Sequence, residues 1–220
     1  MRRGCVKGDV RVVSEHPYQT RLIELIRDSP TLMRALRAAR TVDLPDWLIG
    51  AGVLLDLVWS HLHGLDAMPT SKDVDLVFFD LDTDGERERE AIARLHALAP
   101  DIPWDVQNQA SVHLWYPQAF GIEVEPLTSS ADGVGTWPET ASAVAVKFNA
   151  DEHIDIVAPC GLEDLFELRW RRNPRRVTIA EYQRRLATKR IAERWPLASV
   201  FEAREPRRAL AASHDTEESR

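Results

Sequence analysis

The chain has little cysteine and no long apolar run. Cys5 and Cys160 are the only cysteines among 220 residues, and neither belongs to a C-x-x-C pair. A cysteine zinc site or a disulfide framework is therefore not expected, and a cytoplasmic protein with free thiols is the simplest interpretation. No stretch of about 18 apolar residues occurs, so no membrane-spanning helix is expected. Residues 1–13 are basic but lack an apolar core, so they do not resemble a secretory signal.

The chain also lacks an excess of positive charge, because 35 Asp and Glu outnumber 28 Lys and Arg and the formal net charge is -7. This balance argues against broad, sequence-independent binding to nucleic acid. Residues 161–200 reverse it locally, with ten Lys and Arg against five Asp and Glu. Arginines 169, 171, 172, 175 and 176 supply half of that positive charge. The cluster either faces phosphate groups or forms an ordinary solvated surface, and the pattern alone leaves both interpretations open.

The order of predicted elements indicates an α/β (α+β) protein, because helical and strand patterns alternate along the chain. We expect a flexible N-terminus over residues 1–15, a single domain over 16–200 and a disordered tail over 201–220, which is charged and poor in large apolar residues. The expected helices cover residues 17–39, split at Ser29-Pro30, and 53–63, 86–98, 162–170 and 179–195. The expected strands cover residues 46–50, 73–79, 104–107, 144–148 and 153–157, the last two as a hairpin.

Carboxylates in two of these strands point to metal chemistry. Asp73 and Asp75 open the clearest strand pattern, D-V-D-L-V-F-F, and Asp105 lies in the next strand. Residues i and i+2 of a strand share a face, so Asp73 and Asp75 can direct two carboxylates to one point. Like charges side by side are costly unless a cation neutralises them, and hard oxygen ligands favour Mg²⁺ or Mn²⁺. If its strand lies alongside, Asp105 supplies a third carboxylate.

A turn rich in glycine precedes these carboxylates. Gly50-Ala51-Gly52 joins a short apolar strand to a helix, so its backbone can approach a phosphate closely. The helix that follows offers free N–H groups and the positive end of its dipole. Lys72, directly before Asp73, could contact a triphosphate. Together these features predict a site in which Gly50, Gly52 and Lys72 hold a nucleoside triphosphate beside two metal ions.

The segment G-A-G-V-L-L-D-L-V-W-S-H-L-H-G, followed by S-K-D-V-D-L-V-F-F-D, resembles the core of the polymerase-beta-like nucleotidyltransferase superfamily, and CCA-adding enzymes in particular. The stretches P-W-D-V-Q-N-Q-A-S-V-H-L-W, W-P-E-T-A-S-A-V-A-V, A-P-C-G-L-E-D-L-F-E-L and E-R-W-P resemble a bacterial family of nucleotidyltransferase-like proteins. The resemblance implies a nucleotidyltransferase fold, a small mixed sheet flanked by helices, with further helices toward the C-terminus. It implies Asp73 and Asp75 as metal ligands and Asp105 as the third.

The function implied by the resemblance is nucleotidyl transfer from an NTP, with Mg²⁺ or Mn²⁺ and with release of pyrophosphate. The acceptor could be RNA, a protein or a small molecule, and the sequence indicates neither the acceptor nor the oligomeric state. One departure from the family pattern supports an alternative. Where such proteins commonly have Arg before the polar residue of the helix, this chain has Leu55 before Asp56. A catalytically weak or inactive nucleotide-binding or partner-binding protein, such as an antitoxin-like regulator, would fit that loss.

Two other patterns favour structural roles. Residues 80–85 spell D-x-D-x-D-G, the start of an EF-hand loop, but Ala91 stands where that loop needs a bidentate Glu. A turn that begins the next helix is expected there instead. Tryptophans at 104, 115, 137, 170 and 195 are expected as core anchors rather than as platforms for stacked bases.

Overall fold

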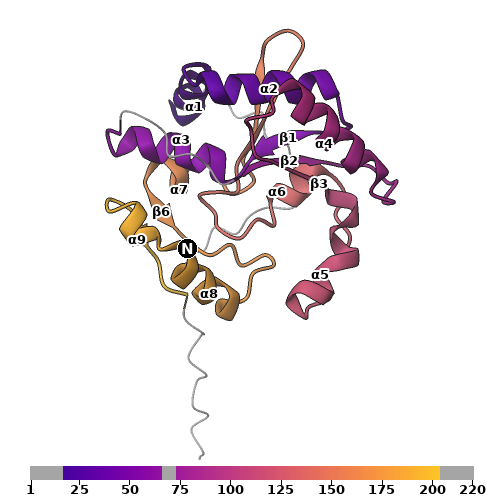
Figure 1. The fold of residues 1–220 in the computed structure, drawn as a ribbon. Helices are drawn as coiled ribbons and strands as arrows, with labels where there is room; N and C mark the ends of the chain where they lie inside the picture. The colour runs from indigo at the N-terminus through magenta and orange to yellow at the C-terminus, as the bar shows by residue number, and fades with distance from the viewer. Residues whose placement is uncertain (1–16, 66–72, 204–220) are drawn as a thin grey trace, which may run out of the picture.

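The computed structural model describes residues 17–65 and 73–203 (Figure 1). The helices are α1 (Pro17–Arg27), α2 (Pro30–Val42), α3 (Gly52–Leu62), α4 (Glu86–Leu98), α5 (Val112–Phe120), α6 (Ser130–Val134), α7 (Glu163–Phe166), α8 (Ile179–Lys189) and α9 (Ile191–Arg194), with a 3-10 turn at Gln109–Ser111. The strands are β1 (Leu48–Gly50), β2 (Val74–Phe78), β3 (Trp104–Asn108), β4 (Ala145–Phe148), β5 (Ile154–Val157), β6 (Arg169–Trp170) and β7 (Ser199–Val200).

A mixed sheet of five strands forms the centre, in the order β3-β2-β1-β4-β5. The strands β2 and β3 are parallel and are joined through α4, whereas the other neighbours are antiparallel. Figure 1 shows α1, α2 and α4 on one side of this sheet and α5, α6 and α8 on the other. The predicted α/β class, the small mixed sheet with flanking helices and the hairpin of β4 and β5 are confirmed.

The two faces of the sheet bury different side chains. The even-numbered residues of β2 belong to the main core, together with residues of α1, α2 and α4. Val77 instead packs against Val134 of α6 in a second, smaller cluster. Because side chains alternate along a strand, Asp73 and Asp75 point to the same face as Val77. The strand pattern therefore directs both carboxylates away from the main core.

The sequence signals at helix ends correspond to observed caps. Ser29 ends the α1–α2 connection, and its side chain accepts a hydrogen bond from the backbone N–H of Leu32 at 3.3 Å. Pro30 then occupies the first turn of α2, where its missing N–H costs nothing. Thr178 caps α8 by accepting from the N–H of Glu181 at 3.1 Å. The predicted break at Ser29-Pro30 is confirmed.

Two expected helices near the C-terminus are shorter in the structure. The helix predicted over 162–170 covers only Glu163–Phe166, because Leu168 takes a positive φ of 53° and the next two residues form β6. The helix predicted over 179–195 is divided into α8 and α9 by Arg190, which has a φ of 48°. Periodicity could not reveal either break, since both left-handed residues are ordinary helix formers.

The segments expected on either side of the domain lie mostly outside the described residues. The chain packs at least as far as Phe201, whose backbone N–H donates to the carbonyl of Trp170 at 2.9 Å. The flexible N-terminus predicted over 1–15 and the tail after residue 203 lie outside the described residues. Within residues 17–65 and 73–203, the helices are all too short or too polar to span a membrane.

Candidate active site

The carboxylates predicted as metal ligands lie on neighbouring strands. Asp75 and Asp105 are direct register partners in the parallel pair β2–β3, so their side chains lie side by side on one face of the sheet. Asp73 precedes β2 by one residue and shares the face of Asp75. Asp73 and Asp105 are exposed and Asp75 is half-buried, so the group opens to solvent. Gly50 pairs with Asp75 from the other side, in β1.

The three carboxylates repel one another. Burial, together with the negative charges of Asp73 and Asp105, raises the pKa of Asp75 to about 7. Burial and the charge of Asp73 also raise the pKa of Asp105. The positive charge of Lys189 and a hydrogen bond from the backbone N–H of Gly52 act in the opposite direction on Asp75. The site therefore concentrates negative charge where a cation would relieve it.

The three carboxylates interact electrostatically, but their oxygen atoms are not arranged around a common point. Among the described residues, no three His, Cys, Asp or Glu side chains are close enough to form a ready-made ion site. Asp75 and Asp105 are register partners, and a bound cation would remove the repulsion between them, so that rotation of the side chains could bring their oxygens onto one ion. Their oxygen donors are of the kind that Mg²⁺ and Mn²⁺ prefer.

The two glycines of the glycine-rich turn, Gly50 and Gly52, have different surroundings. A Cβ on Gly50 would lie 2.7 Å from Cβ and 2.8 Å from Cα of Ala145, and it would also overlap the carbonyl oxygen of Val144. Gly50 is therefore needed for the close contact between β1 and β4. Gly52, at the start of α3, has no atom within 4 Å of the corresponding position and faces open space. Ala51 between them has a φ of 57°, and no side chain caps α3.

Substitution of these glycines should separate packing from ligand contact. Gly50→Ala should lower the free energy of unfolding by roughly 1–3 kcal/mol or more, because backbone atoms of β4 must move to admit the methyl group. Gly52→Ala is the matched control and should leave it within about 0.5 kcal/mol. Urea denaturation of both variants measures the difference. Equal stability of the two would contradict the packing role of Gly50.

Lys189 is a site residue that sequence reasoning missed. It ends α8, is exposed, and lowers the pKa of Asp75 through its positive charge. It lies more than 100 positions from Asp75 in the sequence and belongs to no motif, so only the packing of α8 brings it near the carboxylates. Lys72, the lysine predicted to contact the triphosphate, lies outside the described residues.

The helix position that departs from the family pattern belongs to the core. Leu55 is 4% exposed and packs in the main hydrophobic cluster. Asp56 beside it is 3% exposed and accepts a hydrogen bond from Nη2 of Arg194 at 2.7 Å. This ion pair holds α9 against α3, a connection that the sequence did not indicate.

The arginine cluster is mostly engaged within the protein. Arg171 pairs with Asp164 at 3.4 Å, Arg172 donates to the carbonyl of Val177, and Arg175 forms an ion pair with Asp132. Arg176 donates one hydrogen bond to the carbonyl of Glu125 at 2.6 Å. Its Nη1 atom is buried and has no hydrogen-bond partner among the described residues. Among these four arginines, Nε of Arg171 is the other such donor, but it lies 3.4 Å from a carboxylate oxygen of Asp164.

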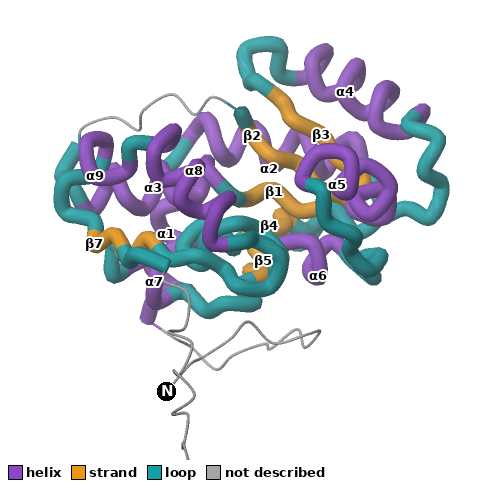
Figure 2. Tube along the Cα trace, turned by 90° about the horizontal axis from the view of Figure 1, so that it is seen from below, coloured by secondary structure: helices purple, strands orange, loops and turns teal. Residues whose placement is uncertain are grey.

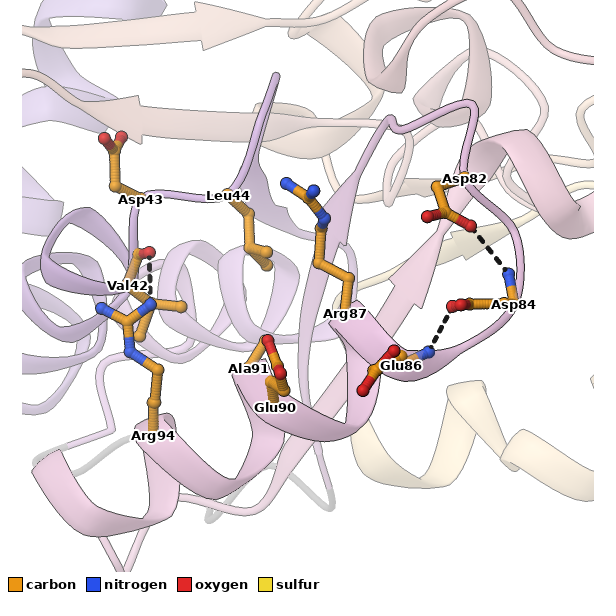
Figure 3. A pocket seen from close by; sticks show the side chains of 10 residues that line it. All are labelled: Val42, Asp43, Leu44, Asp82, Asp84, Glu86, Arg87, Glu90, Ala91 and Arg94. Carbon is orange, nitrogen blue, oxygen red and sulfur yellow. Dashed lines mark hydrogen bonds between the residues drawn. The ribbon is translucent and has the colours of Figure 1, made fainter.

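The acidic loop after β2 has a structural role. The loop lies beside a hollow of about 360 Å³ between the end of α2 and the start of α4. Figure 3 shows the side chains that line it. Asp80, Asp82 and Asp84 each accept a hydrogen bond from the backbone N–H two residues later, at 2.7–3.4 Å. Arg87 pairs with Asp80 at 2.9 Å. The side chains turn inward to the loop, as expected for a turn that starts a helix, and do not converge on an ion.

Two expectations about single residues need correction. Trp115 is 36% exposed and so is not a core anchor, whereas Trp170 and Trp195 are buried as predicted. Cys160 is disulfide-bonded, so the expectation of free thiols is wrong for it. The other cysteine, Cys5, lies outside the described residues.

Comparison with known proteins agrees with this geometry. A family described as "Nucleotidyltransferase" matches residues 37–200. An NMR structure described as revealing a CCA-adding enzyme head domain superposes with a TM-score of 0.71 at 25% identity, covering 89% of this chain and 100% of that one. The Thermotoga maritima CCA-adding enzyme complexed with tRNA superposes with a TM-score of 0.52 at 16% identity, covering 83% of this chain and 42% of that one.

The curated proteins contain no match to the sequence. The family match nevertheless extends over most of the chain and includes the turn at 50–52 and the three carboxylates of the site. The fold and the family agree, and the predicted resemblance is confirmed. The chain belongs to this nucleotidyltransferase family.

Proposed function

We propose that the protein transfers a nucleoside monophosphate from an NTP to an acceptor, with Mg²⁺ or Mn²⁺ bound by Asp73, Asp75 and Asp105. The observation that carries the proposal is the register of β2 and β3, which pairs Asp75 with Asp105 on the face that Asp73 also shares. Three mutually repelling carboxylates destabilise a fold unless a bound ligand neutralises their charge. When bound, the ions would stabilise the leaving pyrophosphate and activate the attacking hydroxyl.

The residues around the carboxylates supply the contacts for the triphosphate. Gly52 faces open space at the uncapped start of α3 and its backbone N–H donates to Asp75, so the first turn of α3 and its dipole lie beside the carboxylates, where they favour a phosphate. Lys189 supplies positive charge for the same group, and Lys72 is expected to do so from its place in the sequence directly before Asp73. In the reaction, the acceptor oxygen bonds to the α-phosphorus and the bond to the bridging oxygen breaks. Pyrophosphate leaves with that electron pair, and the acceptor's proton passes to Asp105.

Two observations bear on the rival interpretation, a binding protein without activity. Leu55, the departure that suggested it, packs in the core and does not reach the carboxylates. The three carboxylates are all present on one face of the sheet. The acceptor is RNA, a protein or a small molecule, and the likeness to a CCA-adding enzyme complexed with tRNA makes RNA the first class to test.

Transfer can be tested with each of the four NTPs carrying a label on the α-phosphate, in the presence of Mn²⁺ and a cell extract. The label should move to a macromolecule or small molecule with stoichiometric release of pyrophosphate. Asp105→Asn should reduce the initial rate by about a hundredfold or more, because such a carboxylate both holds the ion and takes the proton. A γ-phosphate label is the control and should appear only in pyrophosphate. Transfer that survives in Asp105→Asn would contradict the assignment.

A further inference from the structure

The helices α5 and α8 lie on the same side of the sheet (Figures 1 and 2). A groove lies between α5 and the start of α8. Its volume is about 340 Å³, and it is lined by aromatic and apolar residues of α5 and the segment after it, among them Tyr116, Phe120 and Ile122. Arg176, Glu181 and Arg184 line the opposite side. We refer to this feature as the α5–α8 groove.

The α5 side of the groove is unusually apolar for exposed surface. Phe120 and Ile122, which line the groove, are 40% and 37% exposed, and Trp115, which adjoins Tyr116, is 36% exposed. Tyr116 and Phe120 have ring centroids 4.5 Å apart, and Trp115 lies 5.8 Å from Tyr116. Val112 is the only buried residue of α5. Exposed aromatic rings held in one cluster offer planar faces for stacking.

The α8 side supplies a positive charge with spare hydrogen-bonding capacity. The guanidinium of Arg176 lies 5.6 Å from the centroid of the Tyr116 ring. Its Nη1 donor is buried and unpartnered among the described residues, although such donors normally find an acceptor. Arg184 and Glu181 form a bidentate pair at 2.6 and 2.8 Å and neutralise each other, so Arg176 leaves the groove with a net positive charge. An aromatic wall with one unsatisfied arginine suits a ligand that is both planar and anionic.

The helix α8 connects this groove to the carboxylates. Its first turn contributes Glu181 to the groove, while its last residue, Lys189, interacts with Asp75. With a rise of 1.5 Å per residue, the eleven residues of α8 span about 15 Å. A chain bound in the groove could therefore continue along α8 and present its end at the site of transfer.

We propose that the α5–α8 groove binds an unpaired nucleotide of a nucleic-acid acceptor, with the base against the aromatic cluster and a phosphate on Arg176. The proposal rests on the proposed nucleotidyl transfer, since it assigns the acceptor of that reaction. A protein ligand is less well matched, because it would have to place a carboxylate and a planar side chain side by side, whereas every nucleotide carries a phosphate next to its base. The NTP itself uses the other end of α8.

The test measures binding of fluorescein-labelled single-stranded RNA and DNA hexamers by anisotropy, and Mn²⁺-dependent NTP binding separately. Tyr116→Leu should weaken hexamer binding about tenfold, because base stacking on one aromatic side chain is lost. Arg176→Gln should weaken it to a similar extent and reduce its dependence on salt. NTP affinity should stay unchanged in both variants. Tyr116→Phe, which keeps the ring, and Arg37→Gln, an exposed change on α2, should bind hexamers like the wild type.

Several results would overturn the inference, and they are distinct from failure of the proposed function. Wild-type protein that binds NTP but no hexamer, or Tyr116→Leu and Arg176→Gln variants that bind hexamers normally, would show that the groove does not hold a nucleotide of the acceptor. Reduced NTP affinity in Tyr116→Leu would assign the groove to the base of the NTP instead. Absence of Mn²⁺-dependent NTP binding in the wild type would refute the proposed function itself. Thermal melting of each variant shows whether a loss of binding reflects a loss of folding.

Discussion

Replacing Asp75 with asparagine should abolish Mn²⁺-dependent NTP binding and, at the same time, stabilise the metal-free protein above neutral pH. The pKa of the Asp75 carboxyl group is raised from 3.8 to about 7, so the folded protein binds this proton more tightly than the unfolded chain does. The stability associated with that proton is fully present below the unfolded pKa and is lost as the pH rises through about 7. At about pH 8 the ionised Asp75 should cost on the order of 3 kcal/mol, which asparagine avoids.

The measurement is urea denaturation of wild type and Asp75→Asn without metal, at about pH 5 and about pH 8. The wild type should lose stability between the two, whereas the variant should change much less. Added Mn²⁺ and NTP should stabilise only the wild type. Asp28→Asn, the same chemical change at an exposed position on the connection between α1 and α2, should alter neither property. A variant less stable than wild type at the higher pH would contradict the electrostatic account of the site.

Arg185→Leu should lower the free energy of unfolding by about 3–5 kcal/mol, because it leaves a buried carboxylate without its partner. Glu139 is 1% exposed and accepts two hydrogen bonds from Arg185, at 2.6 and 2.8 Å. This pair holds α8 on the body of the protein, and α8 carries both Lys189 and one wall of the α5–α8 groove. The loss of stability should therefore be accompanied by weaker NTP binding.

A matched control is available one residue away. Arg184 is 62% exposed in its side chain and pairs with Glu181 one turn earlier on the same helix, so Arg184→Leu should change stability by about 0.5 kcal/mol or less. The double variant Glu139→Gln with Arg185→Leu should recover part of the loss, since no unpaired charge then remains buried. If the double variant were as unstable as Arg185→Leu alone, packing of the arginine stem rather than its charge would explain the effect.

Local sequence patterns determined most of the central elements. The helix predicted over 86–98 has those same bounds in the structure. The strand predicted over 104–107 is one residue longer and ends at Asn108. Alternation along D-V-D-L-V-F-F was sufficient to predict that Asp73 and Asp75 share a face. These predictions succeed because helix periodicity and strand alternation depend on residues only a few positions apart.

The residues that sequence reasoning missed depend on contacts between distant segments. Lys189 acts on Asp75 only because the fold brings the C-terminal end of α8 near it, and Arg194 pairs with Asp56 over 138 positions. The sequence predicts that Gly50 contacts a phosphate, and its neighbour in β4 gives it in addition a packing role that no local pattern contains. Likewise, the arginines at 171, 172 and 175 form a basic cluster in sequence but find internal partners in space.

The sequence by itself determined the family, the identity of the three carboxylates and the shared face of two of them, because these follow from residue type and near-neighbour geometry. The tertiary structure alone decided that Asp105 lies in register with Asp75, that Lys189 lowers the pKa of Asp75, and that Arg176 keeps an unpartnered donor beside exposed aromatic rings. Strand order and helix packing set these relations, and both arise from burial of apolar surface between segments that the sequence keeps far apart.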